Sequence, residues 1–271
     1  MHIFKRPKRL LLVTVVFVFL AFAGSSYAFG PLVHGEAMNK THDELTAKFP
    51  EVPVLWTVGS DWDQLEADRS GPSHGCDVDY DAGLLNGNLS DMIRPAYQEV
   101  KEGFVAHLQG RQNVDVSVAV RRLCHYAADG MSIGQISGPD LWGRKDDMID
   151  FACELASKKG SWPSSVHDWG AGHYEDALKD FENSVLFTYG RYRQDADKWF
   201  KKFPWFPTSR AVTDMTRWGV SQAATLTANF ILLAWRDAQE ETKPPQAIPN
   251  DPENEGKIAI EETQESGGHE K

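Results

Sequence analysis

The segment that decides the fold class runs from Tyr174 to Tyr192 and reads YEDALKDFENSVLFTYGRY. Its large apolar side chains recur at steps of three and four residues, a spacing that places them on one face of an α-helix. They are Tyr174, Leu178, Phe181, Val185, Tyr189 and Tyr192. Similar stripes lie between Met215 and Leu233 and between Val116 and Ala127, where the pattern stops near Gly130. These three segments are predicted to be helices.

Two shorter stretches, near residues 96–108 and 147–156, have the same helical spacing. No segment alternates strictly between apolar and polar residues, and Asn86-Gly87 lies in a loop rich in Gly and Asp. We therefore predict an all-α fold. The connections Gly59–Ser90 and Gly134–Lys145 are longer than usual, which favours a functional role for them.

The composition is that of an ordinary globular protein. The chain has 271 residues, of which 41% are hydrophobic and 25% charged. This length is sufficient for one sizeable core, so a single multi-helix domain is predicted. The formal net charge of −11 excludes a generally basic surface for nucleic acid, but it is compatible with a small basic or metal-lined groove.

Residues 1–28 have the organisation of a secretory signal peptide. A basic start is followed by an apolar run over residues 10–23 and by small residues that end at Ala28. The run is shorter than the roughly 20 residues that span a bilayer. We predict cleavage after Ala28 and export of the mature chain, secreted or periplasmic, with no stable membrane span. An uncleaved segment that tethers the protein to a membrane is the alternative.

The last segment, residues 239–271, is rich in carboxylates and prolines, and its only apolar cluster is residues 258–260. Such a segment buries too little apolar surface to offset the entropy lost on ordering. It is predicted to be a disordered acidic tail, which leaves residues 29–238 as the folded domain.

The cysteines Cys76, Cys124 and Cys153 form no CxxC pair. In an exported protein, one disulfide and one buried thiol are consistent with this number, and the spacing does not select the pair. Cysteine as a metal ligand is the weaker interpretation.

The sharpest chemical motif is the segment 122–130, RLCHYAADG. His125 and Asp129 are four residues apart, so on a helix they lie on the same face. An imidazole and a carboxylate in this arrangement can bind one divalent ion, although an ordinary hydrogen-bonded pair has the same spacing.

Further landmarks precede this motif. His34 closes the segment FGPLVH that opens the predicted mature chain, Asp61 and Asp63 follow Gly59-Ser60, and His74 follows Gly71-Pro72-Ser73. This order resembles the zinc-dependent phospholipase C and S1/P1 nuclease superfamily over residues 29–238. The resemblance implies an exported all-α domain with a metal cluster at one end.

The resemblance also implies a ligand set for two zinc ions. The amino group and carbonyl of Phe29 would bind one ion together with His34 and Asp129. His74, His125 and Asp129 would bind a second ion, together with one of the two loop aspartates.

Asp63 is the favoured loop aspartate over Asp61, because its offset from Gly59 is nearer to the pattern of the family. The same carboxylate, Asp61 or Asp63, would act as the catalytic general base that orients water.

The third metal position of the family lacks its expected ligands in this chain. Gln135 stands where the family has a histidine, and Ala177 stands four residues after His173. His167 and His173 therefore remain open between ligand and bystander, and the third zinc is expected to be lost or remodelled.

The sequence is compatible with three functions. The favoured one is a secreted zinc phosphodiesterase of the phospholipase C type that acts on phospholipid or a related phosphoester. A single-strand nuclease of the same fold is disfavoured because an acidic surface repels a polyanion. A degenerate member that binds metal without turnover is the third possibility, on account of Gln135 and Ala177.

Overall fold

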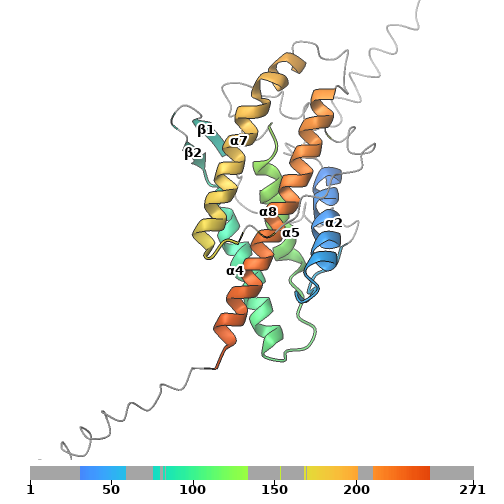
Figure 1. Ribbon diagram of the computed structural model, residues 1–271, viewed down its shortest axis with the longest axis vertical. Helices are drawn as coiled ribbons and strands as arrows, with labels where there is room; N and C mark the ends of the chain where they lie inside the picture. Colours follow the sequence, from blue (N-terminus) through green and yellow to red (C-terminus); the bar gives the residue numbers. More distant parts are fainter. Residues whose placement is uncertain are drawn as a thin grey trace, which may run out of the picture.

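The computed structural model describes residues 31–58, 76–79, 82, 84–133, 153, 168, 170–200 and 210–244, and these are mostly helical (Figure 1). The described elements are α2 (Pro31–Lys48), β1 (Cys76–Asp79), β2 (Leu84–Gly87), α4 (Leu89–Leu108), α5 (Ser117–Gly130), α7 (Tyr174–Phe200) and α8 (Arg210–Thr242). Among them, no helix has the length and apolar character needed to cross a membrane.

Helix α8 lies at the centre of the described helices and contacts α2, α4, α5 and α7 (Figure 1). Between Gly219 and Trp235 every residue except Gln222 is buried, which is the pattern of a core helix. Its buried polar side chains donate to the carbonyl four residues earlier, so burial leaves them satisfied. These residues are Thr216, Thr225, Thr227 and Asn229.

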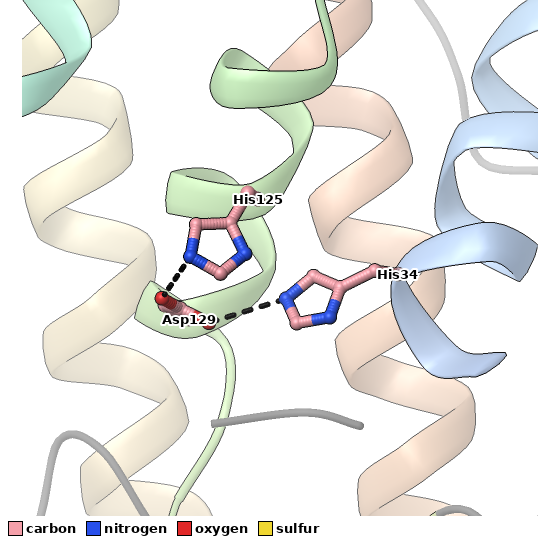
Figure 2. A group of neighbouring side chains, drawn as sticks. All are labelled: His34, His125 and Asp129. Atoms are coloured by element: carbon pink, nitrogen blue, oxygen red, sulfur yellow. Dashed lines mark hydrogen bonds and ion pairs between the residues drawn. The ribbon is translucent and has the colours of Figure 1, made fainter. Parts of the chain in front are cut away.

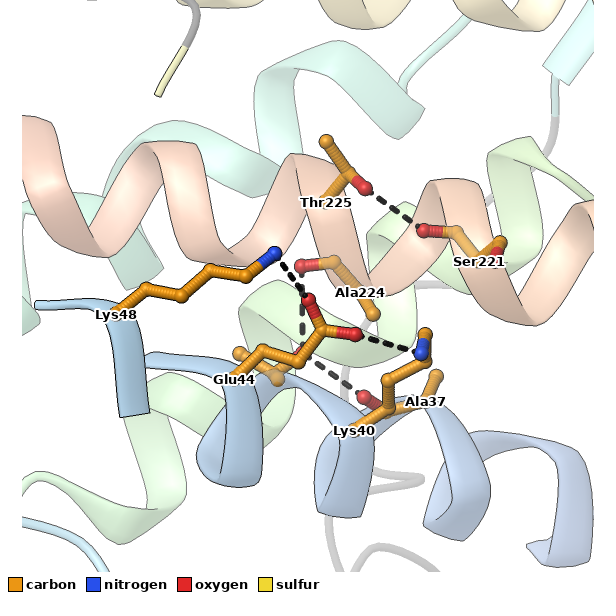
Figure 3. Close-up of polar contacts among 8 residues, drawn as sticks. Ala37, Lys40, Glu44, Lys48, Ser221, Ala224 and Thr225 are labelled. Atoms are coloured by element: carbon orange, nitrogen blue, oxygen red, sulfur yellow. Dashed lines mark hydrogen bonds and ion pairs between the residues drawn. The ribbon is translucent and has the colours of Figure 1, made fainter. Parts of the chain in front are cut away.

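Helix α2 packs on α8 through small and polar residues (Figure 3). The Thr41 hydroxyl lies 2.8 Å from the carbonyl of Ala37 and 3.4 Å from the carbonyl of Ala224. On α2 itself, Glu44 accepts from Lys40 at 2.6 Å and from Lys48 at 3.0 Å. These contacts stabilise α2 and dock it on the core, and so they fix the position of His34 two turns earlier on this helix.

The structure confirms four of the predicted helices. The stripe from Tyr174 lies on α7, the stripe from Met215 on α8, the stripe from Val116 on α5, and residues 96–108 on α4. Helix α8 continues to Thr242, so its last four residues come from the segment that the sequence assigns to the tail. The predicted signal peptide, the predicted helix 147–156 apart from Cys153, and the tail beyond residue 244 lie outside the described residues.

Two features differ from the prediction. Helix α2 has no counterpart among the predicted helices, and a short two-stranded sheet, which was not predicted, accompanies the helices. Strands β1 and β2 pair antiparallel with Cys76 opposite Gly87, so Asn86-Gly87 lies at the end of a strand. A strand of four residues is too short to display a clear alternation of apolar and polar side chains.

Candidate metal centre

The start of α5 is fixed by side-chain hydrogen bonds. Asp115 accepts the backbone N–H of Ser117 at 2.8 Å and its hydroxyl at 2.5 Å, and these bonds lower the pKa of the Asp115 carboxyl. The Ser117 hydroxyl oxygen in turn accepts the N–H of Thr57 at 2.9 Å. Helix α5 is thereby anchored to the segment that follows α2, the other helix that contributes to the site.

His125 and Asp129 lie on the same face of α5, as their spacing predicts. Nε2 of His125 is 3.3 Å from Oδ2 of Asp129. The Asp129 side chain is 1% exposed, whereas the His125 side chain is 25% exposed. The carboxylate is therefore enclosed in protein, and the imidazole of His125 provides the open side of the site.

His34 reaches the same carboxylate from α2 (Figure 2). Its Nε2 lies 3.2 Å from Oδ1 of Asp129, and its ring centroid lies 4.7 Å from that of His125. His34 is 3% exposed, so it belongs to the core although it is near the start of the first described helix. Each carboxylate oxygen of Asp129 thus faces one imidazole nitrogen.

The thiol of Cys124 contacts the backbone of His34. Its sulfur lies 3.9 Å from the carbonyl oxygen of His34 and is fully buried. Burial raises the pKa of this thiol to about 12, so it remains protonated and able to donate. This contact joins α5 to α2 one residue before His125, and the only sequence signal for it is that Cys124 and His125 are adjacent.

Gly130 allows α7 to approach α5 immediately after Asp129. A Cβ atom at this position would lie 2.6 Å from Cε2 of Phe181 and 3.0 Å from Cγ2 of Val185, closer than side chains tolerate. The next residue, Met131, accepts the Thr188 hydroxyl at its sulfur at 3.4 Å. The end of α5 that carries Asp129 is therefore held by close packing against α7.

The three side chains could hold a metal ion. One donor atom from each of His34, His125 and Asp129 lies within 4.8 Å of the others. Two imidazole nitrogens and one carboxylate oxygen form a donor set that suits zinc and similar divalent ions. A buried carboxylate also requires a compensating positive charge, which a protonated histidine or a metal ion can supply.

His173 is the other predicted ligand within the described residues, and it does not join this group. It is exposed at the start of α7, where its N–H donates to Oδ2 of Asp176 at 3.2 Å. Its carbonyl accepts the N–H groups of Asp176 and Ala177. His173 thus caps α7, with Asp176 reaching back to it as in a capping box.

The remaining predicted site residues lie outside the described residues. They are Phe29, Asp61, Asp63, His74 and His167, together with Gln135 at the altered third position. Comparison of the chain with protein-family models, curated proteins and solved structures gives no match. The resemblance to the zinc-dependent phospholipase C superfamily therefore stays a prediction from the sequence.

Proposed function

We propose that this protein is an exported, zinc-dependent phosphodiesterase of the phospholipase C type, built on a single all-α domain. The observation that supports this proposal is the convergence of His34, His125 and Asp129 from helices α2 and α5. The sequence motifs supply the expected reaction and the expected metal, and the geometry supplies a donor set with which they agree.

The residues of the site have distinct roles in this proposal. Asp129 presents one oxygen to each histidine and so fixes both imidazoles in orientation. His125, which is partly exposed, would form the side of the site that a substrate reaches. Zinc bound there would lower the pKa of a water molecule to about 7 and polarise a phosphoryl oxygen.

The proposal also gives roles to residues that lie outside the described ranges. Phe29 and His74 would complete two zinc sites, and Asp63 or Asp61 would act as general base. The proposed substrate is a phospholipid or another phosphodiester, and single-stranded nucleic acid is the less favoured alternative because of the net charge of −11.

One observation keeps a second candidate, a metal-binding member without turnover. His173 caps α7 instead of joining the cluster, and Ala177, four residues later, is buried and has no ligand group. The two candidates differ in turnover, and both differ from a purely structural cluster in metal content.

Metal content is the first experiment. The full chain is expressed with export, its N-terminus is determined, and zinc per chain is measured by elemental analysis. We expect at least one zinc per chain, with affinity falling by more than about 100-fold in His125→Ala. His107→Ala is the matched control, because His107 is an exposed histidine on α4 and should leave zinc unchanged.

Turnover is the second experiment. Bis(p-nitrophenyl) phosphate should be hydrolysed, the activity should disappear with a chelator, and it should return with zinc. Phosphatidylcholine and single-stranded DNA then separate the two substrate classes. Zinc without turnover of any of these would support the non-catalytic candidate, and a protein without zinc would refute both.

A further inference from the structure

A second site lies between α7 and α8, on residues that take no part in the candidate metal centre. A groove of about 740 Å³ is lined by two aromatic side chains, Phe187 and Trp218, and by five polar ones. The polar residues are Asp168, Asp180, Asn183, Ser184 and Gln222. This volume is within the range of small-molecule sites, and the lining combines aromatic rings with hydrogen-bonding groups.

The aromatic wall of the groove is fixed in place. The rings of Phe187 and Trp218 lie 5.1 Å apart at an interplanar angle of 38°. The indole N–H of Trp218 donates to the Thr188 hydroxyl at 2.9 Å, so its only polar atom is satisfied within the protein. Trp218 can therefore offer a ring surface to a ligand without needing a hydrogen-bond acceptor from it.

Phe187 is half exposed. Among the exposed large apolar side chains of the described residues, it has the highest exposed fraction. Arg191 stacks beside it, with its guanidinium carbon 6.0 Å from the Phe187 ring centroid and 5.5 Å from that of Trp218. The half-exposed ring of Phe187 therefore leaves apolar surface at the edge of the groove that a ligand can cover.

The polar residues of the groove include hydrogen-bonding groups that a ligand can use. Within the described part of the chain, the Asp180 carboxylate makes no hydrogen bond or ion pair. Asn183, one helical turn later on α7, is exposed and carries both a donor and an acceptor. Asp168 is held in place by Arg236 at 3.5 Å and by the N–H of Gly170 at 2.7 Å.

We propose that this groove binds a carbohydrate, with a sugar ring stacked on Phe187 and Trp218 and its hydroxyl groups bonded to Asp180 and Asn183. A pyranose has an apolar C–H face and a rim of hydroxyl groups that both donate and accept, and this matches a groove in which aromatic rings lie beside carboxylates and amides.

Other ligand classes fit the groove less well. An organic cation would meet the like charge of Arg191, whose guanidinium carbon lies 6.0 Å from the Phe187 ring centroid and 5.5 Å from that of Trp218. A nucleotide would bring phosphate charge next to Asp168 and Asp180. A hydrocarbon would remove water from the Asp180 carboxylate and the Asn183 amide without offering either a hydrogen-bond partner.

The test is a titration of the full chain with maltose, cellobiose, lactose and chitobiose by calorimetry and saturation-transfer NMR. We expect at least one of them to bind with a dissociation constant in the millimolar range or below. Phe187→Ala and Asp180→Ala should each weaken that binding by about tenfold or more. Leu108→Ala, which removes an exposed apolar side chain at the end of α4, should not change it.

Tetramethylammonium and AMP are titrated in parallel. The proposal is overturned if none of the four disaccharides binds, if binding is equal in wild type and Phe187→Ala, or if only tetramethylammonium or AMP binds. Because Phe187 is half exposed, the variant should keep its fold, which a thermal melt checks. Zinc content is independent of this groove, so failure here leaves the proposed metal centre untouched.

Discussion

Nε2 of His34 lies 3.2 Å from Oδ1 of Asp129, although 95 positions separate the two residues in the chain. The first described helix must therefore dock on α5 and α8 before the candidate metal centre exists. The docking contacts are specific, since Thr41 reaches the carbonyl of Ala224 and Cys124 reaches the carbonyl of His34. Metal affinity and docking of α2 are thus linked, because any ion bound here stabilises the docked state.

Asp129→Asn tests the charge at the centre of the site. The substitution keeps the size of the side chain but removes the negative charge that faces both histidines. We expect zinc content to fall and the free energy of unfolding to drop by about 3 kcal/mol, because the buried Asp129 carboxylate faces both histidines. Elemental analysis and urea titration measure the two effects.

Asp43→Asn is the control for this change, since Asp43 is an exposed aspartate on α2. It should alter stability by less than about 0.5 kcal/mol and leave zinc unchanged. Full zinc occupancy in Asp129→Asn would contradict the assignment of Asp129 as a ligand.

Gly130→Ala tests the packing that holds the end of α5. The added methyl would lie 2.6 Å from Phe181 and 3.0 Å from Val185, so α7 or the end of α5 must move. We expect a loss of about 1–3 kcal/mol in urea titration, accompanied by weaker zinc binding. Gly172→Ala is the matched comparison, because its nearest contact would be Asp176 at 3.9 Å, and wild-type-like stability is expected.

The long helices were predictable because their apolar stripes are long. Six residues from Tyr174 to Tyr192 keep one period, and that period determines the face that α7 buries. Helix α2 lacks such a stripe, because its contact with α8 includes the polar residue Thr41, whose hydroxyl is satisfied by backbone carbonyls. A periodicity argument treats such a residue as exposed.

The residues of the candidate metal centre also differ in how far the sequence predicts them. His125 and Asp129 follow from helical geometry alone, since residues four apart share a face. Their meeting with His34 depends on helix docking, which no local spacing encodes, and only the resemblance to a known family placed His34 in the site. The role of Cys124 was not predicted, because a thiol that contacts a distant backbone carbonyl has no local sequence pattern.

The reactivity of Cys124 follows from its raised pKa. With a pKa of about 12 in the folded protein, the thiolate fraction at pH 8 is on the order of 10⁻⁴. We expect iodoacetamide to leave Cys124 unmodified in the native protein at pH 8 and to alkylate it fully in urea. Peptide mass spectrometry reports the site, and rapid native labelling would contradict the burial of this thiol.

Tyr97 joins α4 to the last part of α8 by donating its hydroxyl to Oδ2 of Asp237. Tyr97→Phe should lower the free energy of unfolding by about 1 kcal/mol at pH 7, because the Asp237 carboxylate loses a donor. Tyr174→Phe is the matched control, since its ring lies 4.8 Å from that of Tyr97. Among the described residues, the buried hydroxyl of Tyr174 has no hydrogen-bond partner, so its removal should be neutral or stabilising.

The pH dependence of the same pair gives an independent check. Burial, and then the hydrogen bond to Asp237, raise the pKa of Tyr97 above its usual value near 10. A group with a raised pKa in the folded state stabilises the fold below the unfolded pKa, and this contribution is lost as the pH rises beyond it. Urea midpoints should therefore fall between pH 9 and pH 11. The fall should be smaller in Tyr97→Phe, and an equal fall in both proteins would show that folding does not raise the pKa of Tyr97.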